Sequence, residues 1–187
     1  MEYFETIKCE DYEVSNLLFH EKRVAKTIGL NLNLQDYIYA PSKELLRCKL
    51  IFDENGVIKV DYYPYQKREI KSFKLIFDDK IEYSKKLLNR EKIEELYRKK
   101  EEADEIIIIK NSFVSDTSIA NIAIFDGTNW LTPKTPLLEG TTRARLLEKG
   151  ELIEKDITVK MLKEAEKIAL MNAMIDFDIL EDYSFFL

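Results

Sequence analysis

The stretch of sequence that decides the fold runs from Val114 to Leu147. It begins Val-Ser-Asp-Thr-Ser-Ile-Ala-Asn-Ile-Ala, passes through Leu-Thr-Pro at 131–133 and ends Gly-Thr-Thr-Arg-Ala-Arg-Leu-Leu. Gly140-Thr141-Thr142 opens an amphipathic segment that we predict to be a helix. The first backbone N–H groups of a helix have no partner within it and carry partial positive charge, so this start suits an anion. A threonine here is also an ordinary helix cap.

Taken in order, these segments resemble the class IV aminotransferase family, the fold-type-IV pyridoxal-phosphate enzymes. The shared elements are Val-x-Asp/Glu-x-x-x-x-Asn, an Asp-Gly turn, Leu-Thr-Pro and Gly-x-Thr-Arg. Further matches are Glu5-Thr6-Ile7 followed by His20-Glu21-Lys22-Arg23, then Lys86-Leu87-Leu88-Asn89-Arg90, and finally Asn172-Ala173. The resemblance spans residues 3 to about 177, which is nearly the whole chain.

The resemblance implies that pyridoxal 5'-phosphate binds in a cleft between two small domains. It implies that Lys86 is the catalytic lysine, which forms the Schiff base and then acts as general base. Asp116 would face the pyridine nitrogen, where most relatives carry glutamate, and would keep the ring electron-poor. A phosphate cup would be formed by Arg23, Thr141, Thr142 and Asn172.

Each of these residues also has a structural interpretation. Lys86 follows Lys85 beside a charged segment, where a solvated pair is common, and a slip of one residue would exchange their faces. Asp116 is also suited to capping a turn. Arg23 fits an arginine on the surface of an amphipathic helix, and Asn121 fits a residue that fixes a local turn. The substrate carboxylate has three open candidates, namely Arg143, Arg47 and His20.

The resemblance implies a homodimer and an enzyme with one of two activities. The sequence around Lys86 looks most like 4-amino-4-deoxychorismate lyase, which releases pyruvate and 4-aminobenzoate for folate synthesis. The alternative is an aminotransferase acting on branched-chain or D-amino acids with a 2-oxo acid. A cofactor-binding protein without activity stays open, because the chain is shorter than most of the family. A small acidic adaptor domain is the alternative outside enzymology, and it predicts no cofactor.

Composition limits the other classes of protein. The net charge of −6 argues against a nucleic-acid binder, which needs clustered cationic surface. Neither a secretory signal nor a membrane-spanning apolar run is evident, so we expect a cytoplasmic protein in which Cys9 and Cys48 are reduced thiols. His20 is the only histidine, and no metal site is predicted.

The pattern along the chain predicts an α/β (α+β) protein with an N-terminal domain over 1–82 and a C-terminal cofactor-binding domain over 83–187. Strands are expected at 4–9, 49–52, 57–63, 73–77, 81–83, 106–110, 113–115 and 122–125. Helices are expected at 20–28, 42–46, 89–103, 143–148 and 160–171. The apolar tail at 183–187 suits either a dimer interface or a last buried strand.

Overall fold

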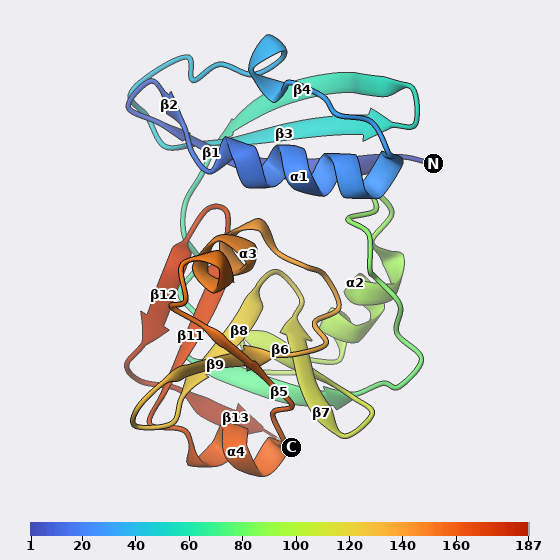
Figure 1. Ribbon diagram of the computed structural model, residues 1–187. Helices are drawn as coiled ribbons and strands as arrows, with labels where there is room; N and C mark the ends of the chain where they lie inside the picture. Colours follow the sequence, from blue (N-terminus) through green and yellow to red (C-terminus); the bar gives the residue numbers. More distant parts are fainter. Residues whose placement is uncertain (187) are drawn as a thin grey trace. The chain divides into compact units, whose positions relative to one another are not determined.

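The computed structural model describes residues 1–186, which form two compact units (Figure 1). The first unit contains Met1–Lys67 and Lys85–Asn89, and the second contains Arg68–Ser84 and the chain from Arg90 onward. The segment that carries Lys86 therefore belongs to the first unit, although the residues on both sides of it belong to the second. Each unit has its own sheet, so the predicted mixed α/β class is confirmed.

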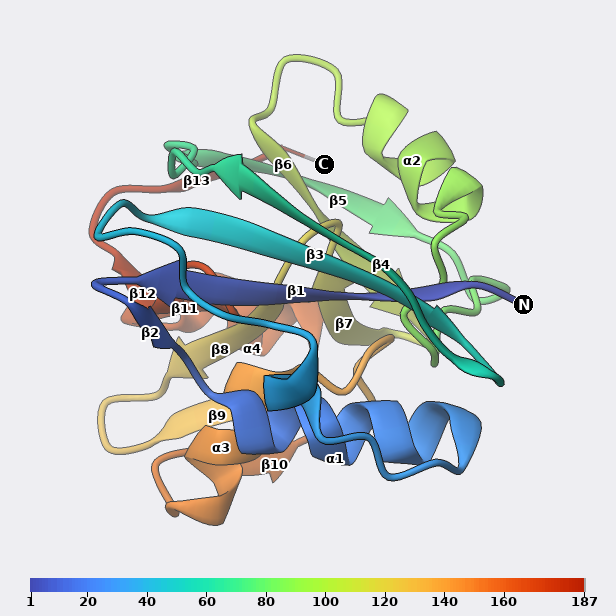
Figure 2. The same cartoon turned by 90° about the horizontal axis from the view of Figure 1, so that it is seen from above.

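The first unit is a four-stranded antiparallel sheet in the order β2-β1-β3-β4, with α1 packed against it (Figure 2). Its elements are β1 (Tyr3–Glu10), β2 (Glu13–Val14), α1 (Leu17–Ile28), a short 3-10 helix (Leu34–Asp36), β3 (Leu46–Asp53) and β4 (Gly56–Pro64). The predicted Asn55-Gly56 hairpin is present between β3 and β4. Gly56 has φ +126°, a backbone conformation that favours glycine. Val24 of α1 joins Ile7 of β1 in the core.

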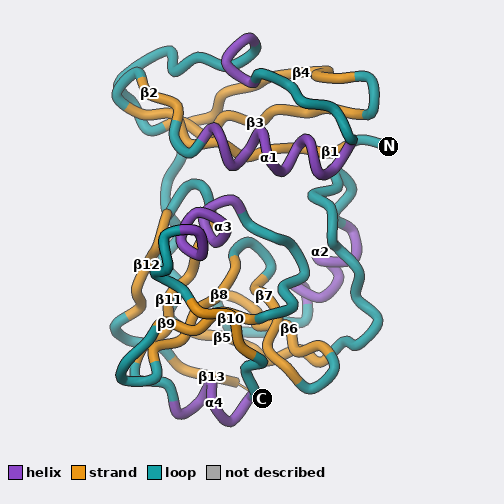
Figure 3. Tube along the Cα trace, viewed as in Figure 1, coloured by secondary structure: helices purple, strands orange, loops and turns teal. Residues whose placement is uncertain are grey.

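The second unit consists mainly of strands (Figure 3). Its sheet runs β10-β9-β8-β7-β6-β5-β13, and β11 pairs with both β8 and β12. The strands are β5 (Ser72–Phe77), β6 (Glu105–Lys110), β7 (Phe113–Thr117), β8 (Asn121–Phe125), β9 (Trp130–Pro133), β10 (Ile153–Lys155), β11 (Lys167–Asn172), β12 (Asp176–Leu180) and β13 (Ser184–Phe186). The helices are α2 (Glu91–Arg98), α3 (Thr141–Glu148) and α4 (Val159–Glu164).

The apolar run Ile106–Ile109 forms the centre of this sheet. All four side chains are fully buried, so both faces of the sheet are covered at β6, and its two edges pair with β5 in parallel and β7 in antiparallel. The tail also contributes a strand, since β13 pairs with β5 and Phe185 packs on Phe73. Leu187 lies outside the described residues.

Two of the predicted short elements are wrong. The segment 42–46 is not a helix, because the carbonyl groups of Ser42 and Lys43 accept the backbone N–H groups of Tyr12 and Asp11. The segment 81–83 is not a strand. Asp78 accepts the backbone N–H groups at 80 and 81 and turns the chain there.

The predicted helix over 160–171 is correct only in its first half. Thr158 caps α4 by accepting the N–H of Met161, and the chain leaves the helical conformation at Ala165, which has ψ 138°. Residues 168–171 are then fully buried in β11, which pairs with β8 on one edge and β12 on the other. A short apolar run that is buried on both faces has no periodicity to distinguish strand from helix.

No helix in the described part of the chain is both long enough and apolar enough to span a membrane.

Candidate functional site

Lys86 extends the edge of β1 in the first unit. Its carbonyl accepts the N–H of Phe4 at 3.0 Å, and a bridge joins Leu87 to Tyr3. The Lys86 Nζ atom lies 4.6 Å from the centre of the Phe4 ring. Lys86 is therefore held on a strand-like segment rather than on a free loop.

The neighbouring Lys85 is directed elsewhere. Its Nζ atom donates to the carbonyl of Thr27 at 2.8 Å, near the end of α1, and lies 5.6 Å from the Tyr3 ring centre. Successive side chains of an extended segment point to opposite faces, which explains why the two lysines have different surroundings. The Thr27 contact gives Lys85 a structural role and supports the choice of Lys86 as the candidate catalytic lysine.

Arg23 is held in place by a buried carboxylate. The Nε atom of Arg23 donates to Oε1 of Glu5 at 2.7 Å, and its Nη2 atom donates to Oε2. Oε2 also lies 2.6 Å from Nδ1 of His20. Two parallel bonds to one carboxylate fix the plane of a guanidinium. The motif pairs Glu5-Thr6 and His20-x-x-Arg23 are thus one cluster, in which Glu5 is a member that the sequence analysis did not single out.

The charges of this cluster explain the pKa values of Glu5 and His20. Burial alone would raise the pKa of Glu5, but the charge of Arg23 and the hydrogen bonds from His20 and Arg23 outweigh burial and lower the pKa to about 2. Burial lowers the pKa of His20, against the influence of Glu5. The charge of Lys86 also contributes to this lowering. A neutral His20 donates from Nδ1, and its buried Nε2 has no partner among residues 1–186.

In the second unit, Asp116 is buried on β7 opposite Asn121 of β8. Its Oδ1 atom accepts from Nδ2 of Asn121 at 2.7 Å, and its Oδ2 atom accepts the N–H of Leu138 at 3.0 Å. Burial raises the pKa of Asp116 to about 7, although these hydrogen bonds and the charge of Arg143 oppose the rise. The carboxyl group therefore changes its charge near neutral pH.

This raised pKa predicts a pH-dependent stability for the cofactor-free protein. An acid whose folded pKa is raised stabilises the fold fully below its unfolded pKa, and that stability is lost as the pH rises toward the folded value. For Asp116 this stability is lost over the pH range from about 4 to about 7. From pH 5 to pH 8 the free energy of unfolding of the wild type, measured with urea, should fall by about 2–3 kcal/mol relative to that of Asp116→Ala. An equal difference between the two proteins at both pH values would contradict the raised pKa.

The start of α3 carries Thr141 and Thr142, both buried. Gly140 precedes the helix, and within the described chain no side chain caps it. The first backbone N–H groups therefore lack the usual capping partner. These donors suit an anion, as the sequence predicts.

Two further arginines were candidates for a substrate carboxylate. The Nη2 atom of Arg143 donates to the carbonyl of Pro133 at 2.8 Å and to Glu154 at 2.6 Å, so this group tethers α3 to β9 and β10. The Arg47 guanidinium lies 5.3 Å from the Tyr63 ring centre, on β3 and β4 of the first unit.

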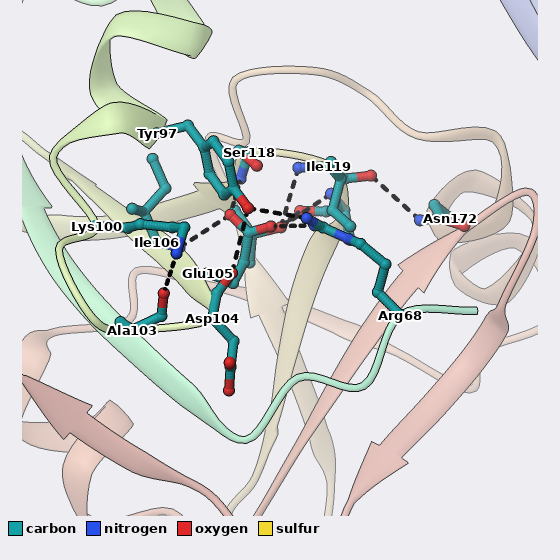
Figure 4. A network of polar contacts seen from close by, with 12 residues as sticks. Arg68, Tyr97, Lys100, Ala103, Asp104, Glu105, Ile106, Ser118, Ile119 and Asn172 are labelled. Atoms are coloured by element: carbon teal, nitrogen blue, oxygen red, sulfur yellow. Dashed lines mark hydrogen bonds and ion pairs between the residues drawn. The ribbon is translucent and has the colours of Figure 1, made fainter. Parts of the chain in front are cut away.

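A network of polar contacts holds the turn between β7 and β8 (Figure 4). Oε1 of the buried Glu105 accepts the N–H of Ser118 at 3.2 Å, and its Oε2 accepts from Arg68 at 2.8 Å. Arg90 donates to the carbonyl of Ser118 at 2.6 Å. Asn172 donates from Nδ2 to the carbonyl of Ile119 at 3.2 Å. The network thus brings Asn172 to the hairpin that carries Asp116.

The structure therefore places the predicted residues in two groups. Lys86, Arg23 and His20 belong to the first unit, and Asp116, Thr141, Thr142 and Asn172 belong to the second. Glu105, Arg68 and Arg90 were missed as supporting residues. Arg90 stands in the quoted Lys-x-x-Asn-Arg motif, so its sequence signal was available.

Comparison with known proteins agrees with this architecture. A solved structure from Haemophilus somnus 129PT, described as that of a proposed 4-amino-4-deoxychorismate lyase, is 33% identical and has a TM-score of 0.83. It covers 92% of this chain and 96% of its own. A protein of Haemophilus influenzae with no assigned function is 33% identical over 182 residues, which are 91% of this chain and 96% of that protein. The pyridoxal-phosphate-bound form of a hypothetical Mycobacterium tuberculosis aminotransferase shares the fold. Its TM-score is 0.79 at 18% identity, over 98% of this chain and 81% of that chain.

The two units and their sheets thus define a fold like that of the fold-type-IV aminotransferases. The chain belongs to the class IV aminotransferase family, whose sequence pattern matches residues 65–177. Members of this family are generally pyridoxal-phosphate enzymes.

Proposed function

We propose that this protein is a pyridoxal-phosphate-dependent 4-amino-4-deoxychorismate lyase that releases pyruvate and 4-aminobenzoate. The observation that carries the proposal is the separation of the two lysines, with Lys85 bonded to Thr27 and Lys86 held over the Phe4 ring, where its charge acts on His20. The full-length similarity to the Haemophilus somnus structure supports the choice of the lyase.

The residues present fit the cofactor by their chemistry. Arg23 is a cation whose guanidinium is held in one plane by Glu5, and the start of α3 offers backbone N–H donors without a side-chain cap. Both features suit a phosphate group. Asp116 is a buried carboxyl group that, in its ionised form, can hold a protonated ring nitrogen, and a cation at that place would oppose the burial that raises its pKa to about 7. Asn172 adds an amide beside the β7–β8 turn.

Each residue then has a defined task. When bound, the cofactor withdraws electrons from the substrate carbon that carries the amino group. Lys86 would hold the cofactor covalently, and its free amine would take the proton from that carbon. Asp116 balances the charge at the ring nitrogen. Arg23, Thr141 and Thr142 would hold the phosphate.

The fate of the proton held by Lys86 separates a lyase from an aminotransferase. A lyase returns this proton to the product and therefore needs no 2-oxo acid. An aminotransferase keeps the substrate amine on the cofactor after the first half of its reaction, and needs a 2-oxo acid to complete the cycle. An aminotransferase acting on branched-chain or D-amino acids is the second candidate, because the family match and the Mycobacterium tuberculosis fold are consistent with it.

We expect purified holoenzyme to convert 4-amino-4-deoxychorismate to 4-aminobenzoate and pyruvate without any added 2-oxo acid. In parallel, the enzyme should be offered a panel of L- and D-amino acids, with and without 2-oxoglutarate. Loss of the cofactor's visible absorbance with a simple amino acid alone, without formation of 4-aminobenzoate, would exclude the lyase and favour the aminotransferase.

A further inference from the structure

The side chain of Asn121 is fixed through its amide nitrogen. It opens β8, is 6% exposed, and lies opposite Asp116 across the β7–β8 pair. Its Nδ2 atom donates to Oδ1 of Asp116 at 2.7 Å and to the carbonyl of Leu138 at 2.8 Å. An amide nitrogen has two hydrogens, so both are used.

The oxygen of the same amide faces the start of α3. A Cβ atom added to Gly140 would lie 1.9 Å from Oδ1 of Asn121, which is far inside any real contact distance. Because the two donor bonds fix the amide, Oδ1 cannot turn away without breaking them. Gly140 is therefore required by the close approach of Asn121, and not by its backbone angles, since its φ is −69°.

Leu138 closes a ring of contacts. Its carbonyl accepts from Asn121, and its N–H donates to Oδ2 of Asp116 at 3.0 Å. The segment that leads into α3 is thus bound at 138 by both side chains and touched at 140 by the Asn121 oxygen. The charge of Arg143, in the first turn of α3, also acts on Asp116.

These contacts connect two parts of the proposed cofactor site that are 24 residues apart in sequence, from Asp116 to Gly140. Asp116 is the proposed partner of the ring nitrogen, and the start of α3 is the proposed partner of the phosphate.

We propose that Asn121 is a positioning residue. It keeps a fixed distance between the Asp116 carboxylate and the start of α3, so that both can contact one ligand at the same time. This inference rests on the proposed function for the identity of that ligand. The coupling between Asp116 and α3 is independent of the proposed function, because it is a property of the cofactor-free chain.

The first test measures the coupling without cofactor. The pKa of the Asp116 carboxyl should be followed by carbon NMR in the wild type, Asn121→Ala and Asn129→Ala. Asn129 is an exposed asparagine in the β8–β9 turn and serves as the matched control. Loss of the donor to the ionised carboxylate should raise the pKa of Asp116 by about one pH unit in Asn121→Ala, and Asn129→Ala should match the wild type. An unchanged value in Asn121→Ala would overturn the proposal.

Gly140→Ala tests the same coupling from the other element. The added methyl group must displace the Asn121 amide, so it should raise the pKa of Asp116 in the same direction as Asn121→Ala. If Gly140→Ala folds and leaves this pKa at the wild-type value, Asn121 does not transmit the position of α3 to Asp116.

The second test uses two probes, pyridoxal 5'-phosphate and inorganic phosphate. A positioning role predicts that Asn121→Ala binds pyridoxal phosphate at least about tenfold more weakly, because a ligand that engages two parts at once loses most when their spacing loosens. Inorganic phosphate engages one part only, so its affinity should stay within roughly twofold. Equal losses for both probes would indicate simple damage to α3 and would overturn the proposal. Failure of the wild type to bind pyridoxal phosphate, with the Asp116 pKa change present, would reject the proposed function and leave the coupling standing.

Discussion

Replacing Lys86 with alanine should abolish the borohydride-stable attachment of pyridoxal phosphate to this protein, whereas replacing Lys85 with alanine should leave that attachment intact. Only an uncharged amine can form the covalent link, and alanine provides none. The Lys85 amine is bonded to the carbonyl of Thr27, where its role is to join the Lys85–Asn89 segment to α1. The expected contrast is therefore between complete loss and near-complete retention of the label.

The measurement is reduction of the holoprotein with borohydride, followed by mass spectrometry of its peptides. Lys85→Ala is a matched control, since it removes the same side chain one position away on the same strand-like segment. An adduct that maps to Lys85 in the wild type would mean that the register of the segment is shifted by one residue, and the assignment of Lys86 would be wrong.

Replacing Glu5 with alanine should destabilise the protein by about 3–5 kcal/mol, which is the usual cost of removing one partner of a buried ion pair. The carboxylate is fully buried and is bonded to both Arg23 and His20, so its loss removes the counter-charge that Glu5 provides to a guanidinium whose side chain is 13% exposed. Glu10→Ala is the control on the same strand. Glu10 forms a partly exposed pair with Lys8, and its loss should cost less than about 1 kcal/mol. Urea unfolding at neutral pH measures both values.

The pH dependence of a second variant at this position, Glu5→Gln, provides an independent check. An acid whose folded pKa is lowered stabilises the fold above its unfolded pKa, and this stability is lost as the pH falls toward the folded value. For Glu5 the window runs from 4.5 down to about 2. The stability difference between wild type and Glu5→Gln should therefore be constant above pH 4.5 and should shrink below it. A difference that does not change between pH 5 and pH 2.5 would contradict the assigned pKa.

The sequence predicts those elements whose signal is local. The Asn55-Gly56 hairpin and α1 depend on turn chemistry and periodicity that lie within a few residues. The β11 strand could not be predicted this way, since residues 168–171 become a strand only because β8 and β12 lie on both sides of them. Its apolar residues continue the pattern of α4, and pairing with distant strands decides their conformation.

A similar division applies to the candidate site. Lys86 and Asp116 stand out because ordered motifs surround them. Glu105 does not, because it ends the acidic run 101–105 and has the composition of a solvated surface. Its burial follows from its place at the start of β6, where Arg68 and the N–H of Ser118 reach it from distant parts of the chain. A buried charge of this kind can be recognised only after its partners are in place.

The five residues Lys85–Asn89 have a consequence for how the chain can be divided and synthesised. The N–H of Phe4 donates to the carbonyl of Lys86, and the N–H of Leu88 donates to the carbonyl of Glu2, so the first strand is completed by residues more than eighty positions downstream. A fragment that ends at Lys67 would lack both these bonds and the candidate lysine. On the ribosome, the N-terminal unit can therefore be completed only after residues 68–84 of the second unit have been synthesised.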